Sequence, residues 1–221
     1  KWSSFFKGHF IERSCKKDLL TKIKDSVQKA PEIISVIASP GWGKTFLLRD
    51  IAVELYREGT PIFWLNPYGT IEVEGNGETT IILGTWDSQR IDRLIGMIND
   101  KAKELSLFGG KGIPIIISDN CPERIEEVLS LFKYLRSSNR TFILVLAVRN
   151  NEFDTIVHEN RLLKRGIQFR PEDFYDSQEE VRRLIDFCEL HNVGAIESTG
   201  QKEIIAQRII DSEADAAIIL A

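Results

Sequence analysis

Three short runs of apolar residues constrain the fold of this chain more than any other feature of its sequence. They cover residues 33–38, 113–117 and 141–147 and are rich in β-branched side chains. None of the three alternates between apolar and polar residues. Such unbroken apolarity is typical of strands that are covered on both faces in a parallel sheet.

Two weaker strand candidates, residues 61–65 and 80–83, flank a segment of a different kind. Residues 68–78 alternate between apolar and polar side chains and end in Gly-Asn-Gly at 75–77. Alternation beside a glycine-rich turn predicts a β-hairpin.

The segments around the apolar runs have the spacing of amphipathic helices, because apolar residues return every three or four positions. These segments are residues 19–27, 46–55, 91–98 and 125–135. Ser14 is the expected N-cap of the first of them. Strands that alternate with helices predict an α/β fold with right-handed crossovers.

The character of the sequence changes at about Pro171. Strand-like runs stop there, and residues 179–191 and 204–210 have helical period. We therefore expect two parts, an α/β core over residues 1–171 and a small helical subdomain over residues 172–221.

Composition narrows the class of protein. The 221 residues carry a formal net charge of −4, so the broad basic surface of a nucleic-acid-binding domain is missing. No apolar run reaches the roughly 20 residues that span a membrane. Cys15, Cys121 and Cys188 have neither disulfide nor zinc spacing, which favours a reducing, cytoplasmic location. The apolar residues 216–221 lead us to expect a piece of a longer protein.

A glycine-rich turn joins the first apolar run to the helix that follows it. Residues 38–45 read Ala-Ser-Pro-Gly-Trp-Gly-Lys-Thr. Gly41 and Gly43 let the backbone curl until its amides point at a phosphate group, and the helix start adds its positive dipole. Lys44 would supply a cation to the outer phosphates of a nucleotide, and Thr45 a hydroxyl ligand for Mg²⁺.

An acidic residue follows the second apolar run. Asp119 stands at the carboxyl end of that strand, where it would hold Mg²⁺ through water or, on a simpler interpretation, form a turn. Many ATPases that combine such a glycine-rich loop with an acidic strand end carry a glutamate at the next position, whereas this chain has Asn120. An amide orients water but accepts no proton at neutral pH, so hydrolysis is expected to be slow.

Basic residues follow the third apolar run. Arg149 emerges at the end of that strand and either senses the γ-phosphate or lies solvated at the surface. A basic cluster comes next, and it either supplies an arginine finger to a neighbouring copy or forms a solvated face. Its members are Arg161, Lys164, Arg165 and Arg170.

Taken in order, these residues resemble the STAND and AAA+ branch of the P-loop ATPases. Residues 10–13, Phe-Ile-Glu-Arg, are similar to a degenerate form of the family's N-terminal motif. Residues 38–45 resemble the Walker A motif, and residues 115–120 resemble Walker B. Residues 168–174 look like the fifth strand leading into a helical lid.

The resemblance implies a three-layer P-loop NTPase with five parallel strands in the order 5-1-4-3-2 and a lid over the nucleotide. It implies ATP or ADP with Mg²⁺. The nucleotide would contact Phe10, Ile11, Ser39, Pro40, Gly41, Trp42, Gly43, Lys44, Thr45, Phe46 and Pro171. The catalytic residues would be Lys44, Asp119, Asn120 and Arg149, and the metal-binding residues would be Thr45 and Asp119. The Trp42 side chain is expected to point outward.

Three functions compete on these observations. The first is a regulatory module with slow or conditional ATP hydrolysis, whose ATP/ADP state acts as a conformational switch in a larger signalling or defence protein. Its partners would be flanking effector or sensor domains and other copies of the chain. The second is a motor or loader ATPase acting on nucleic acid, which the net charge of −4 disfavours. The third is a nucleotide-binding scaffold without turnover, which Asn120 favours.

Overall fold

The computed structural model describes residues 11–65, 71–75, 78–81, 113–119, 125–174, 178–180, 182 and 183, and the single residues 6, 96, 100 and 186. The expected helix at 204–210 and most of those at 91–98 and 179–191 lie outside these residues, as does most of the expected subdomain at 172–221. Residues 96 and 100 and the described residues from 178 to 186 are helical.

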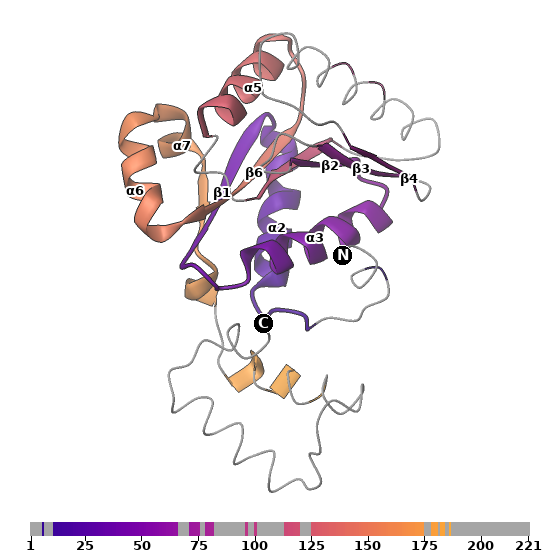
Figure 1. The fold of residues 1–221 in the computed structure, drawn as a ribbon, viewed down its shortest axis with the longest axis vertical. Coiled ribbons are helices and arrows are strands. Elements are labelled where there is room, and N and C mark those ends of the chain that lie inside the picture. The colour runs from indigo at the N-terminus through magenta and orange to yellow at the C-terminus, as the bar shows by residue number, and fades with distance from the viewer. Residues whose placement is uncertain are drawn as a thin grey trace, which may run out of the picture.

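One seven-stranded sheet organises the chain, in the order β4-β3-β2-β5-β6-β1-β7 (Figure 1). The strands are β1 (Glu32–Ala38), β2 (Ile62–Leu65), β3 (Ile71–Gly75), β4 (Glu78–Ile81), β5 (Ile115–Ser118), β6 (Ile143–Arg149) and β7 (Ile167–Phe169). β2, β5, β6, β1 and β7 are parallel. Numbered along the chain, these five strands have the order 5-1-4-3-2, so the expected fold class is confirmed.

The two remaining strands form the hairpin that the alternating segment predicts. β3 pairs antiparallel with β2 on one side and with β4 on the other. The pairing of β3 with β4 runs from Glu72 with Ile81 to Gly75 with Glu78. The strand candidate at 80–83 corresponds to β4, which begins and ends two residues earlier.

Helices cover both faces of the sheet (Figure 1). They are α2 (Lys16–Ser26), α3 (Lys44–Arg57), α5 (Ile125–Ser137), α6 (Asn150–Glu159) and α7 (Arg161–Arg165), with short 3-10 turns η1 (Val27–Lys29) and η3 (Pro171–Phe174). The sequence did not lead us to expect α6 and α7, because apolar residues are sparse in both. None of the helices in the described part of the chain is long and apolar enough to cross a membrane.

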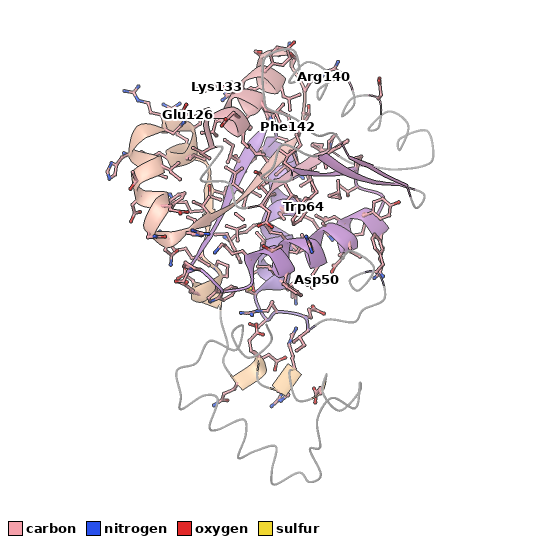
Figure 2. The ribbon with its side chains drawn as sticks, in the orientation of Figure 1. Asp50, Trp64, Glu126, Lys133, Arg140 and Phe142 are labelled. Atoms are coloured by element: carbon pink, nitrogen blue, oxygen red, sulfur yellow. The ribbon has the colours of Figure 1, made fainter. Side chains whose placement is uncertain are left out.

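The core has two halves, one on each face of the sheet. Ile33 of β1 packs in the cluster that includes residues of α5, α6 and α7, and the next residue, Ile34, packs in the cluster that includes residues of α2 and α3. Phe142 and Trp64, labelled in Figure 2, belong to the first and the second cluster respectively. Burial of β1 on both faces explains why its sequence shows no alternation.

The start of α2 differs from the expected one. Ser14 does not cap the helix: Cys15 is the N-cap residue, and no side chain caps the first turn. The Ser14 hydroxyl instead donates to Glu180 Oε1 at 3.0 Å. Cys15 is a free, buried thiol, and burial raises its pKa to about 12.

A buried ion cluster joins α2 to α3. The Nζ of Lys16 lies 2.8 Å from Asp50 Oδ1 and 2.7 Å from Glu54 Oε2. Burial alone would lower the pKa of Lys16, but these hydrogen bonds outweigh it and the pKa is raised. Asp50 lies on α3 (Figure 2), and burial raises its pKa to about 6 in spite of Lys16. The helix that follows the glycine-rich turn is therefore fixed to α2 by charge as well as by apolar packing.

Candidate nucleotide-binding site

The turn between β1 and α3 has the backbone that the glycines predict. Gly41 and Gly43 have φ angles of +79° and +84°, in the left-handed region that glycine adopts without strain. The Trp42 amide donates to the Ser39 carbonyl at 3.3 Å, which closes the first part of the turn. α3 begins at Lys44, directly after the second left-handed glycine. Successive amides in such a turn, together with the helix start, form a concave site for an anion.

Lys44 closes the base of this loop. Its Nζ donates to the carbonyls of Ala38 at 2.8 Å and Ser39 at 2.9 Å, which hold the ammonium group beside the loop. Burial lowers the pKa of Lys44, the positive charge of Arg149 lowers it further, and Asp119 acts in the opposite direction. A polyphosphate beside Nζ would supply the negative charge that this partly buried ammonium lacks.

Thr45 and Asp119 meet across the site. The Thr45 hydroxyl donates to Asp119 Oδ1 at 3.0 Å, although the two residues are 74 positions apart. A hydroxyl and a carboxylate oxygen are ligands that suit Mg²⁺. Within the described residues no group of three or more His, Cys, Asp or Glu side chains could hold a metal by itself. A cation here would therefore complete its shell with water and phosphate oxygens, as Mg²⁺ commonly does.

A polar network lies against the first residues of the loop. Glu172 Oε1 accepts hydrogen bonds from the amide and the hydroxyl of Ser39, both at 3.2 Å. The Asn150 amide donates to the Ser39 hydroxyl and to Glu172, each at 3.3 Å. Arg170 donates to Asn150 Oδ1 at 3.4 Å. Residues that follow β6 and β7 thus contact the loop that follows β1.

The network changes the interpretation of the residues at the end of β6. Arg149 is 45% exposed at its side chain, and its guanidinium pairs with Glu152 at 3.3 Å. Asn150, the next residue, is the one that contacts the loop. The sensing role of Arg149 stays a prediction, supported here only by the effect of its charge on Lys44.

The two aromatic candidates among the described residues, Trp42 and Phe46, have opposite surroundings. Trp42 is only 4% exposed, so the expectation that its side chain points outward is wrong. It belongs to the core cluster that includes residues of α2 and α3, and Arg13 stacks on it with Cζ 4.3 Å from the ring centroid. Phe46, on the first turn of α3, is 57% exposed beside Thr45.

The other candidates divide by what the structure describes. Phe10 and Asn120 lie outside the described residues. Pro40 and Gly41 are exposed at the loop tip, Ile11 is half-buried, and Pro171 is buried beside Glu172 at the start of η3. Of the basic cluster, Arg161, Lys164 and Arg165 are exposed, and only Arg170 reaches the network.

Sequence reasoning gave no site role to three residues that the structure brings to the loop, Arg13, Asn150 and Glu172. It gave none to Glu180 either, which pairs with Arg13. The position of Asn150 at the end of a buried strand was a usable signal, because the carboxyl edge of a parallel sheet gathers site residues. Glu172 directly follows the expected Pro171, which was a weaker signal. Nothing local in the sequence indicates the contacts of Glu180.

One protein family and several solved structures are similar to this chain. Residues 1–82 match the family described as Novel STAND NTPase 5. The structure is similar to Hsp104 of S. cerevisiae in a casein complex, at 13% sequence identity and a TM-score of 0.62, covering 99% of this chain and 38% of that one. Hsp104 in a closed state with ATPγS and casein has 13% identity and a TM-score of 0.51, with 86% and 32% covered. No curated protein sequence matches the chain.

These similarities confirm the expected resemblance to STAND and AAA+ P-loop ATPases. The family match includes the glycine-rich loop, and the Hsp104 structures share the fold with this chain. The chain spans about two fifths of the Hsp104 chain that it matches, 38% of its length. At 13% identity the likeness concerns the fold alone.

Proposed function

We propose that the chain is an ATP-binding regulatory module that hydrolyses ATP slowly or conditionally, with the ATP/ADP state acting as a conformational switch in a larger protein. One observation carries the proposal. The Thr45 hydroxyl lies 3.0 Å from Asp119 Oδ1, beside a loop with two left-handed glycines and a half-buried lysine. Those groups together match the charge and the metal shell of a nucleoside triphosphate with Mg²⁺.

Each group has a distinct task in this proposal. The loop amides and Lys44 bind and orient the phosphate chain, and Thr45 and Asp119 hold the cation, Asp119 through water. Mg²⁺ held there would supply positive charge against the phosphate oxygens. Asn120 orients the attacking water but accepts no proton, so turnover is limited by the missing base.

The proposed partners are flanking effector or sensor domains and other copies of the chain, as the STAND resemblance implies. A nucleic-acid substrate is not part of the proposal, since the net charge of −4 gives no general attraction to a phosphate backbone.

Substitution of Lys44 tests nucleotide binding. Lys44→Ala removes a charge-assisted contact to phosphate worth about 1.5–3 kcal/mol, so ATP affinity should fall by one to two orders of magnitude. Calorimetric titration of the folded variant with ATP and Mg²⁺ measures the loss. Lys24→Ala, in an exposed pair with Glu58, is the matched control and should bind as the unmodified protein does. Equal affinity in both variants would refute the site.

Substitution of Asp119 tests the metal. Asp119→Ala should weaken ATP binding when Mg²⁺ is present and change it little in EDTA, because the carboxylate acts on the cation. The same titration in the two buffers gives the comparison. An equal loss with and without Mg²⁺ would show that Asp119 has another role.

The rate of ATP turnover tests whether hydrolysis is slow, as the proposed switch requires. We expect phosphate release far below the median enzyme rate of about 10 per second, by two to four powers of ten. Asn120→Glu should accelerate it by supplying a proton acceptor. Release from both proteins at saturating ATP is the measurement, and fast release from the unmodified chain would contradict the proposal.

A further inference from the structure

A buried contact joins three parts of the chain that lie far apart in the sequence. Arg13 comes from the segment before α2, Trp42 from the glycine-rich loop, and Glu180 from the helical residues 178–180. The three side chains are almost fully enclosed, since Arg13, Trp42 and Glu180 are 6%, 4% and 2% exposed. The residues around Glu180 are drawn in orange in Figure 1, apart from the sheet.

The guanidinium of Arg13 is held from two directions. Its Nε lies 3.2 Å from Glu180 Oε1, an ion pair that is shielded from water. Its Cζ lies 4.3 Å from the centre of the Trp42 ring, the geometry of a cation–π contact. A planar guanidinium makes both contacts at once, whereas an ammonium group has no flat face to stack on the ring.

Arg13 also approaches the turn that precedes Lys44. A Cβ atom at Gly43 would lie 3.5 Å from Arg13 Nη1, so the guanidinium borders the left-handed residue at the start of α3. Trp42 and Gly43 are consecutive. The guanidinium therefore packs on the part of the loop that directly precedes Lys44.

Glu180 is itself anchored to the segment that carries Arg13. Its Oε1 accepts hydrogen bonds from the Ser14 amide at 2.7 Å and the Ser14 hydroxyl at 3.0 Å. Arg183, three residues further on, donates to the Glu12 carbonyl at 3.3 Å. Movement of Glu180 away from the core would take a carboxylate away from the buried Arg13, and breaking a buried ion pair is strongly destabilising.

We propose that Arg13 is a positioning residue for the glycine-rich loop and that Glu180 holds it in place. The segment around Glu180 thereby controls how tightly the loop retains a nucleotide. The inference rests on the proposed nucleotide binding and adds its regulation. With Glu180 paired, Arg13 clamps Trp42 and the loop amides are preorganised for phosphate. With Glu180 displaced, the clamp loosens and the nucleotide leaves faster, because preorganisation has been lost.

Dissociation of a fluorescent nucleotide tests whether Glu180 controls nucleotide release. Glu180→Gln keeps the size of the side chain and removes its charge, and we expect release of mant-ADP in stopped flow to accelerate about tenfold. Arg182→Gln is the matched control, since Arg182 is on the same helix but is 75% exposed and contacts only Glu179 among the ion pairs of the described residues. Its release rate should equal that of the unmodified chain.

Trp42 supplies a readout that needs no nucleotide. The fluorescence of Trp42 is obtained by subtracting the emission spectrum of the Trp42→Phe counterpart from that of each protein. In Glu180→Gln this difference spectrum should move to the red and be quenched more strongly by acrylamide, because Trp42 loses its cover. Arg13→Lys should do the same while keeping the positive charge, since the stacking plane is gone. A purely structural role for Glu180 would lower the melting temperature without changing Trp42 accessibility.

The outcomes separate the two proposals. Unchanged mant-ADP release and unchanged Trp42 quenching in folded Glu180→Gln would overturn the inference. If that variant does not fold, the same two measurements on Arg13→Lys decide. If the unmodified chain binds no mant-ADP, the proposed function fails and the nucleotide part of the inference fails with it. Trp42 quenching then still decides whether Glu180 holds Arg13 on the loop.

Discussion

At the scale of single residues, the described core is unusual in the charges that it buries next to α3. Asp50 is 5% exposed and Lys16 is 8% exposed, and Lys16 Nζ lies 2.8 Å from Asp50 Oδ1. Burial raises the pKa of Asp50 to about 6, against the effect of Lys16. The folded protein thus binds a proton at Asp50 more tightly than the unfolded chain does, and the stability of the α2–α3 contact depends on pH.

The sign of that dependence gives a prediction. The contribution of Asp50 to stability is fully present below about pH 4 and is lost as the pH rises through about 6. Asp50→Asn has no such titration. The free energy of unfolding of the unmodified protein, minus that of Asp50→Asn, should therefore be larger at pH 4.5 than at pH 7.5. Urea unfolding of both proteins at the two pH values measures it.

The control for this experiment is Glu58→Gln. Glu58 pairs with Lys24 at 2.7 Å on the surface, where both side chains are more than two fifths exposed, at 44% and 45%. Exposed pairs of this kind contribute about 0–1 kcal/mol, so this variant should show a small difference at either pH. If the free energy of unfolding of the unmodified protein, minus that of Asp50→Asn, grows with rising pH, the raised pKa of Asp50 is contradicted.

At the scale of secondary-structure elements, β7 is the strand that brings Pro171 and Glu172 to the loop. It pairs with β1 over only three residue pairs, Ile34 to Ile167 through Val36 to Phe169. The turn from α7 into β7 therefore determines where β7 lies. Gly166 in this turn packs directly on β1.

The close approach at Gly166 leads to a prediction about stability. A Cβ atom there would lie 2.8 Å from the Ile33 carbonyl oxygen, a distance that real Cβ atoms do not reach. Gly166→Ala must push β7 away from β1, and overpacking of this kind costs about 1–3 kcal/mol. Chemical denaturation measures the loss. The variant should also bind ATP more weakly, because Glu172 moves with β7.

Gly96→Ala is the comparison for Gly166→Ala. Gly96 is helical and has nothing within 4 Å of the position that a Cβ would take. Alanine there should leave stability unchanged or raise it by up to about 1 kcal/mol. Equal effects of the two substitutions would show that contact with Ile33 is not what requires glycine at 166.

At the scale of the whole molecule, nucleotide binding and folding are linked. The site draws on the residues after β1, β5, β6 and β7 and on the start of α3, so only the assembled sheet presents it. A ligand that binds the folded chain alone stabilises it by mass action.

The size of this linkage is a prediction. At an ATP concentration 100 times Kd the gain is about 2.7 kcal/mol. For a chain of this length that corresponds to a rise in melting temperature of roughly 5–10 °C. Thermal unfolding with ATP and Mg²⁺ should show this rise for the unmodified chain and for Lys24→Ala, and Lys44→Ala should lose most of it. The same rise in Lys44→Ala would place the nucleotide elsewhere.

The features that the sequence determined by itself are those that neighbouring residues specify together. Runs that are apolar at every position indicated β1, β5 and β6, because burial on both faces removes alternation. Gly41, Gly43 and Lys44 predicted the loop, since left-handed backbone and a helix start are local properties. Asp119 was expected at the site because the carboxyl ends of parallel strands meet at one edge of a sheet.

Only the tertiary structure decided which polar side chains meet. The Ser14 hydroxyl donates to Glu180, 166 positions away, and does not cap α2. The Trp42 ring is buried in the core cluster of α2 and α3, with Arg13 stacked on it. Asn150 contacts the loop, whereas Arg149 turns to Glu152. Sequence patterns report local backbone and burial, whereas the partner of a polar side chain depends on how distant elements pack. That is the physical reason why the loop was predictable and the contacts that hold it were not.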